Sequence, residues 1–244
     1  MIIGSDYIFL ESVGSTNTHA SACIDAGHVP EGTVFYAGFQ TGGRGQMGSR
    51  WESEKGKNLL FSVVLYPSML QPSDQFVISM FISLGLIDFV GSYIPCCTVK
   101  WPNDIYAGND KIAGILIENT LLGSSISSTV AGIGININQE TFPGYLKNPV
   151  SLRLLTGSGY DILTCLKEVA ACLDKRYKQV ISGDVLSIRE KYVSSLYGLD
   201  EWRRYRSRNG EFTGRIISVS DQGLLRIETE GEVRDYAFKE VEFI

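Results

Sequence analysis

Histidine and paired cysteines are scarce in this sequence. Only 2 histidines occur in 244 residues, and the 5 cysteines form no Cys-x-x-Cys pair. Zinc-type sites need clusters of these residues at short spacings, so we expect no metal held by histidine and cysteine. An odd number of cysteines also fits a disulfide framework poorly. Reduced thiols in a cytoplasmic protein are the simplest interpretation.

Long apolar runs and a strong charge are missing as well. We expect no apolar stretch long enough to span a membrane, and Met1–Leu10 lacks the regions of a signal peptide. The net charge of −5 and the pI of about 5.2 do not indicate a general nucleic-acid surface. The hydrophobic share of 44% is that of a globular protein with a real core.

One stretch is rich in glycine and arginine. Residues 40–51 read Gln-Thr-Gly-Gly-Arg-Gly-Gln-Met-Gly-Ser-Arg-Trp. Glycines allow sharp turns and a close approach to a ligand, and successive backbone N–H groups can form an anion site. Arg44 and Arg50 add fixed charge suited to carboxylate or phosphate. The stretch predicts a loop that wraps an anionic small molecule.

Three known glycine motifs fit this loop less well. The spacing Gly43-x-Gly45-x-x-Gly48 matches the dinucleotide fingerprint, but a buried strand rather than a helix is expected over residues 58–65. No Lys-Ser/Thr pair follows as in a P-loop, and no kinase His-Arg-Asp or Asp-Phe-Gly occurs later. The remaining alternative is a flexible surface loop. Trp51 and the two arginines favour a functional loop over this alternative.

The hydrophobic pattern predicts a mixed α+β fold followed by a small β-barrel. We expect strands over residues 7–10, 33–39, 58–66, 98–106, 111–118 and 129–138, and helices over 18–26, from 72 onward, 161–182 and 184–197. Five short strands follow over 202–207, 211–219, 224–228, 233–238 and 241–244. The sequence therefore predicts two domains, residues 1–197 and 198–244.

Polar residues gather at three further places. Ser15, Thr16 and Asn17 precede the first helix, where they could cap it or hold a polar ligand. The run Lys100-Trp101-Pro102-Asn103-Asp104 breaks a strand, and Lys111 returns to the same end of the hairpin. Gly132, Gly134, Asn136 and Asn138 share one face of a strand, either as a ligand surface or as an ordinary wet edge.

Four of these motifs together resemble biotin protein ligases in order and spacing. They are residues 43–51, Lys100–Asp104, the run Lys-Ile-Ala-Gly-Ile-Leu-Ile-Glu at 111–118, and Gly-Ile-Gly-Ile-Asn-Ile-Asn at 132–138. Residues 198–244 resemble the small SH3-like domain of that family. The resemblance implies a class II synthetase-like, lipoate-ligase-like mixed sheet with packed helices.

The resemblance also implies the reaction of a biotin–[acetyl-CoA-carboxylase] ligase. Biotin's carboxylate attacks the α-phosphate of ATP, which gives biotinyl-5′-AMP and pyrophosphate. A lysine of a biotin carboxyl carrier domain then attacks the adenylate and releases AMP. Mg²⁺ is expected to accompany the nucleotide phosphates.

Site residues carry over from the family motif by motif. Biotin would be bound by Ser15, Thr16, Asn17, Gln40, Gly43, Arg44, Gly45, Gln46, Lys111, Gly114 and Gly132. ATP and the adenylate would meet Arg44, Trp51, Asn103, Asn136 and Asn138. The catalytic set would be Lys111 and Arg44 at the reacting oxygens, Asp104 toward the incoming amine, and Lys100 in support.

The chain departs from the family pattern at two places. Gln46 and Ser49 stand where the family often has basic residues, and we hypothesise that Arg50 or another cation compensates. The catalytic pattern begins by Tyr7, so we expect no N-terminal DNA-binding domain and no repressor role. A homodimer through an exposed strand edge is another expectation.

Two other functions remain open from the sequence. A lipoate or octanoyl ligase or transferase shares the fold, although the Lys100–Asp104 block and the arginine-glycine loop argue against it. The second alternative is a protein that binds the carrier domain but has lost catalysis. The presence of both Lys111 and Arg44 argues against it.

Overall fold

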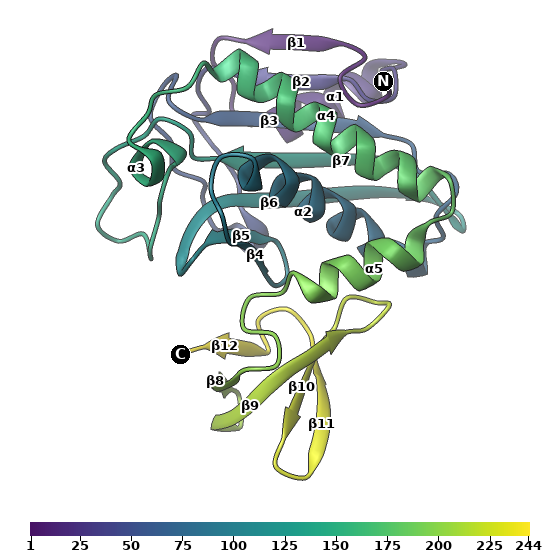
Figure 1. Cartoon of the computed structure of the whole chain (residues 1–244). Coiled ribbons are helices and arrows are strands. Elements are labelled where there is room, and N and C mark those ends of the chain that lie inside the picture. The colour runs from purple at the N-terminus through teal and green to yellow at the C-terminus, as the bar shows by residue number, and fades with distance from the viewer.

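Two β-sheets and the helices around them make up the chain (Figure 1). The structure is a computed structural model that describes residues 1–244, apart from the side chain of Met47. The larger sheet has seven strands in the order β1-β2-β3-β7-β6-β5-β4. Its strands are β1 (Tyr7–Leu10), β2 (Val34–Ala37), β3 (Leu59–Leu65), β4 (Cys97–Lys100), β5 (Asp104–Ala107), β6 (Asp110–Leu122) and β7 (Ser125–Ile135).

The two faces of this sheet differ because side chains alternate along each strand. On β3, Leu59, Phe61, Val63 and Leu65 belong to the main core, under helices α2 (Phe76–Gly91) and α4 (Ile162–Ile181). Val64 points to the other face, where it packs with Ala20 of α1 (Thr16–Ala26). Figure 1 shows α2 and α4 over one face, whereas α1 lies behind the sheet.

Strand β7 lies in the middle of the sheet, so the interpretation of residues 129–138 as an edge strand is wrong. It pairs antiparallel with both β3 and β6. Gly132 lies between Ser62 and Leu116 in register, and Gly134 lies between Leu60 and Gly114. Small residues therefore gather at the centre of the sheet, on neighbouring strands.

Helix α2 corrects the expectation about apolar length. Together with the short 3₁₀ turn Pro72–Asp74 it forms a stretch of 20 residues that is long and apolar enough to cross a membrane. Of an 18-residue window within this stretch, 67% is buried, because the sheet, α4 and α5 (Val185–Ser194) pack around it. A helix that is mostly apolar and mostly buried against its neighbours is typical of a protein core.

The smaller sheet is antiparallel, with the order β11-β10-β9-β8-β12. It contains β8 (Trp202–Ser207), β9 (Gly210–Val219), β10 (Leu225–Thr229), β11 (Glu232–Tyr236) and β12 (Val241–Phe243). All five predicted strands are present. Tyr205, Ile216 and Leu225 join the same hydrophobic cluster as the larger sheet. The division at 197/198 falls between α5 and β8 and stays a prediction.

Most predicted elements agree with the structure within a few residues. The exceptions lie around the hairpins. The strand expected over 98–106 is two strands, β4 and β5, which pair with each other across a turn that contains Pro102. Strands β6 and β7 are longer than predicted and pair as a hairpin of their own. A short helix, α3 (Leu152–Thr156), was not predicted.

Gly85 lies where α2 packs closely against α4. A Cβ added there would lie 2.7 Å from Leu173 Cδ2 and 3.1 Å from its Cα. We predict that Gly85→Val destabilises the fold by about 2 kcal/mol or more, because the backbone of α4 must move. Chemical denaturation measures the loss.

Gly91→Ala is the matched control for that variant. Gly91 ends the same helix, and no atom lies within 4 Å of an added Cβ. Alanine favours helix over glycine, so this variant should keep or gain stability. Equal stability of Gly85→Val and wild type would contradict the close packing.

Candidate functional site

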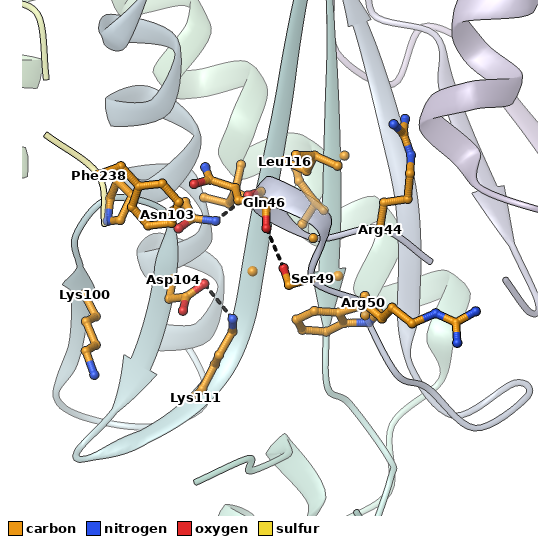
Figure 2. Close-up of a pocket in the computed structure, with 18 of the residues that line it drawn as sticks. Arg44, Gln46, Ser49, Arg50, Lys100, Asn103, Asp104, Lys111, Leu116 and Phe238 are labelled. Carbon is orange, nitrogen blue, oxygen red and sulfur yellow. Dashed lines mark hydrogen bonds and ion pairs between the residues drawn. The ribbon is translucent and has the colours of Figure 1, made fainter. Parts of the chain in front are cut away.

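A cavity of about 660 Å³ opens on the α1 face of the large sheet (Figure 2). Most of its lining comes from four places that the sequence had singled out. These are the start of α1 (Ser15, Thr16, Asn17), the glycine loop (Gln40, Arg44, Gly45, Gln46, Ser49, Arg50, Trp51), the β4–β5 turn with Lys111, and the glycines of β6 and β7 (Gly114, Gly132, Gly134). The fold therefore brings separate motifs to one place.

The ring of Trp51 lies against the floor of this cavity. A Cβ on Gly114 would come within 2.9 Å of the ring, and one on Gly134 within 2.4 Å. Both glycines are needed because a larger residue would lift the ring off the sheet. The buried Nε1 of Trp51 has no hydrogen-bond partner among the described residues.

A buried polar group sits at the start of α1. Ser15 precedes the helix with extended backbone, but its side chain makes no capping hydrogen bond. Thr16 donates from its backbone N and its Oγ1 to Gln40 Oε1, at 2.7 and 3.1 Å. Asn17 lies so close to β7 that a Cβ on Gly132 would be 2.2 Å from its Oδ1. These hydroxyls and amides favour the ligand-binding interpretation over helix capping.

The glycine loop folds back on itself. Gly45 N donates to Ser49 O at 2.8 Å, and Trp51 N donates to Gly43 O at 3.1 Å. Ser49 Oγ donates to Gln46 O at 2.8 Å (Figure 2). Gly48 has a φ of 83°, a conformation that favours glycine. Gly43 touches Trp51 and is not part of the cavity lining.

The two arginines of the loop point away from the hairpin end. Figure 2 shows the guanidinium groups of Arg44 and Arg50 directed away from Lys111 and Asp104. Arg44 Nη2 pairs with Glu118 Oε2 at 2.8 Å. The hypothesis that Arg50 replaces the basic residues missing at 46 and 49 has no support from this orientation. Lys147 and Lys239 are two further cations in the cavity lining.

An ion pair joins Lys111 and Asp104 inside the cavity. Lys111 Nζ lies 2.7 Å from Asp104 Oδ1, and both side chains are largely shielded (Figure 2). The lysine also lies 5.7 Å from the centre of the Trp51 ring. One half-buried cation thus bridges the loop side and the hairpin side of the cavity.

Lys100 is enclosed by aromatic rings. Its Nζ lies 4.7 Å from the centre of the Tyr106 ring and 5.0 Å from that of Phe243, and it donates to Tyr106 Oη at 3.2 Å. Burial lowers the pKa of Lys100 below the ordinary value for lysine. Asp104 opposes that shift, whereas Lys111, Lys147 and Arg203 add to it.

Three predicted asparagines act on the backbone. Asn103 Nδ2 donates to Ile115 O at 2.7 Å, which joins the β4–β5 turn to β6 at the cavity wall. Asn136 Nδ2 donates to Val150 O, and Asn138 exchanges two hydrogen bonds with the backbone of Tyr160. Asn136 and Asn138 lie outside the cavity lining, although the buried Oδ1 of Asn136 has no partner among the described residues.

Several lining residues escaped the sequence reasoning. The small sheet supplies Phe238, Lys239, Val241, Glu242 and Phe243, and the loop after β7 supplies Lys147. No local pattern marks these residues, because only the packing of the two sheets places them. Ser62 and Glu118, which contact Asn17, could have been noticed: a hydroxyl interrupts the apolar strand at Ser62.

Comparison with known proteins identifies the family. Residues 9–138 match the model of the "Biotin/lipoate A/B protein ligase family". The bifunctional ligase/repressor BirA of Bacillus subtilis is 30% identical over 247 residues, which cover 99% of this chain and 75% of the relative. The chain belongs to this family.

Solved structures of the family agree in fold. The biotin protein ligase of Aquifex aeolicus, in complex with biotin and ATP, superposes with a TM-score of 0.81 at 27% identity. The match covers 98% of this chain and 99% of that one. It includes the small C-terminal sheet, so both the predicted resemblance and the predicted fold class are confirmed.

The charges around Lys100 generate a testable prediction. Asp104→Asn removes the carboxylate that raises the pKa of Lys100 and leaves Lys111 and Lys147 unopposed, so this pKa should fall further. Lys111→Met removes a cation and should shift the pKa in the opposite direction. Acylation of each lysine as a function of pH, followed by mass spectrometry, measures both shifts.

The exposed side chain of Lys55, which lies outside the cavity lining and is not among the charges that act on Lys100, serves as the internal reference in each sample. Shifts of Lys100 in the same direction in both variants would show that changes in burial, rather than these charges, govern its pKa.

Proposed function

We propose that this chain is an ATP-dependent biotin protein ligase that makes biotinyl-5′-AMP and transfers biotin to a lysine of a biotin carboxyl carrier domain. One observation carries the proposal. A single cavity gathers a buried amide and hydroxyl pocket, a glycine loop bearing Arg44, and the half-buried Lys111. Relatives named as biotin ligases, together with the Aquifex aeolicus ligase in complex with biotin and ATP, support it.

The polar pocket at α1 suits the ring of biotin. Ser15, Thr16, Asn17 and Gln40 offer hydroxyl and amide groups that can donate to or accept from a ureido group. Because Gly132 has no side chain, Asn17 can occupy the space beside β7. A buried ligand group would be hydrogen-bonded on all sides, which gives selectivity for a ring of that chemistry.

Lys111 and Arg44 suit the activation step. A carboxylate oxygen of biotin forms a bond to the α-phosphorus, and the bond to pyrophosphate breaks. These fixed cations would offset the negative charge that gathers in this step. The described residues contain no group of three or more His, Cys, Asp or Glu side chains placed to hold a metal. We propose that Mg²⁺ accompanies the nucleotide and is bound chiefly through its phosphates.

One unpaired buried atom of the cavity lining suits an adenine edge. Trp51 Nε1 is a donor with no partner among the described residues. Adenine carries acceptor nitrogens, so it could satisfy this donor. Asn136 Oδ1 is also unpaired but lies outside the cavity lining, so its proposed role toward the nucleotide is indirect. Asn103 and Asn138 would act indirectly, because their side chains donate hydrogen bonds to backbone carbonyl groups and not to the nucleotide.

Asp104 and Lys100 suit the transfer step. The acceptor amine forms a bond to the carbonyl carbon of the adenylate, the bond to the phosphate oxygen breaks, and AMP leaves. The amine's proton would pass to Asp104, which in the structure already pairs with an ammonium group, that of Lys111. Lys100 adds positive charge near the leaving phosphate.

Further parts of the proposal concern the setting of the enzyme. We propose that it acts in the cytoplasm, that residues 198–244 form a separate SH3-like domain, and that strands at the edges of the large sheet could pair two copies. Operator DNA is not a proposed partner.

Transfer of labelled biotin to a carrier domain tests the function. Wild-type protein with ATP should label the carrier lysine, and Lys111→Ala should lose at least about a hundredfold in rate, as expected for one lost transition-state contact. Lipoate supplied in parallel distinguishes the two activities of the family. Labelling by lipoate alone would overturn the proposal.

Two glycine variants should separate the two ligands. Alanine at Gly132 would press on Asn17 Oδ1, and alanine at Gly134 would press on the Trp51 ring. Calorimetry should show that Gly132→Ala weakens biotin binding on the order of tenfold, or about 1.4 kcal/mol, and leaves ATP binding near wild type. Gly134→Ala should show the reverse.

Each glycine variant controls for the other, since both residues lie on β7. Equal losses of both ligands in both variants would place biotin and nucleotide elsewhere.

A further inference from the structure

Glu118 bridges two groups of the proposed biotin site, although it does not line the cavity. Its Oε2 accepts from Asn17 Nδ2 at 2.8 Å and from Arg44 Nη2 at 2.8 Å. Asn17 belongs to the start of α1, whereas Arg44 belongs to the glycine loop. One carboxylate oxygen on β6 therefore links a wall of the pocket to the loop.

The link continues through buried groups to the other end of the same loop. Ser62 Oγ lies 2.6 Å from Asn17 Oδ1 and 2.7 Å from Thr16 Oγ1. Thr16 in turn donates to Gln40 Oε1. Gln40 and Arg44 lie four positions apart in the loop, so the chain of hydrogen bonds closes into a ring.

Glu118 determines which way the Asn17 amide faces. The two N–H groups of Asn17 go to acceptors, Leu116 O at 3.1 Å and Glu118 Oε2. Its Oδ1 must then face Ser62 and the glycine at 132. Without the carboxylate, one of these two donors would lose its acceptor. The hydrogen bond that favours this orientation of the amide would then be missing.

The contact with Glu118 uses only part of the hydrogen-bonding capacity of Arg44. A guanidinium has five N–H donors, and among the described residues the Arg44 side chain makes only the one hydrogen bond to Glu118. Its side chain is 46% exposed, at the cavity. Arg44 is thus held beside the sheet with most of its donors available for an anion.

We propose that Glu118 is a positioning residue that orients Asn17 and holds Arg44, so that the pocket for the biotin ring and the arginine of the loop are arranged together before the ligand binds. The inference rests on the proposed function, because it takes Thr16, Asn17 and Gln40 as the biotin pocket. Glu118 touches neither the reacting atoms nor the cavity, so its effect is on binding rather than on the chemical step.

Two substitutions separate the two contacts of Glu118. Glu118→Ala removes the carboxylate, and with it the hydrogen bonds to Asn17 and Arg44. Glu118→Gln keeps an amide oxygen for Asn17 and loses the charge that attracts Arg44. Calorimetry without nucleotide should show biotin binding weakened on the order of tenfold in Glu118→Ala, and only about two- to threefold in Glu118→Gln. In turnover assays KM for biotin should rise in parallel, and by a larger factor than kcat falls.

Trypsin reports the loop without any ligand. It cleaves after Arg44 and Arg50, and both variants of Glu118 should be cut there several times faster than wild type, because Arg44 is no longer tethered. This readout does not depend on biotin. A wild-type protein that binds no biotin would therefore sink the proposed function, while the cleavage rates would still test the Glu118–Arg44 contact.

Glu228→Gln is the matched control. Glu228 pairs with Arg215 on the small sheet, and its side chain is 34% exposed against 35% for Glu118. This variant should bind biotin and resist trypsin as wild type does. Unchanged biotin affinity together with unchanged cleavage in Glu118→Ala would overturn the proposal, as would equal falls in kcat and kcat/KM at unchanged KM.

Discussion

Repulsion between two anions is the constraint on which the proposed site depends. A carboxylate and a phosphate about 4 Å apart repel by about 4 kcal/mol at an effective dielectric constant of 20, before any bond begins to form. The chain as a whole is acidic, with a net charge of −5. The cavity nevertheless collects cations from several segments: Arg44, Arg50, Lys100, Lys111, Lys147 and Lys239. The cavity lining thus carries more cations than anions, because Asp104 and Glu242 are its acidic residues.

Those cations can be held near a ligand because the sheet beneath them is unusually bare. Alternation along β3, β6 and β7 sends one set of apolar side chains into the helical layer and turns the small residues Ser62, Gly114, Gly132 and Gly134 to the other face, where Leu60 and Leu116 flank them. Trp51 lies against the glycines, and Asn17 fits against Gly132. The same sheet therefore builds a dense core on one face and a ligand bed on the other. Helix α1 packs on the part of that face that lies outside the cavity.

Local signals in the sequence predict most of the fold and much of the site. Apolar period and turn residues predict nearly all strands, and the glycine loop, the hairpin break and Lys111 converge as expected. Side-chain direction is less predictable. Asn136 and Asn138 share a face with Gly132 in sequence period, yet their amides hold the backbone of the following segment. Arg44 was expected at the reacting oxygens, but its side chain pairs with Glu118, which lies 74 residues away in sequence.

The part of the site that sequence reasoning could not find is the wall from the small sheet. Phe243 of β12 packs over Lys100, and Phe238 packs against Trp101. Trp101 also donates from Nε1 to Gly223 O at 2.9 Å, so the residue at the hairpin break is fastened to the small sheet. Moving that sheet would expose Lys100 to water and loosen the turn that carries Asn103 and Asp104. The small sheet is therefore part of the environment of Lys100 and of the turn that carries Asn103 and Asp104.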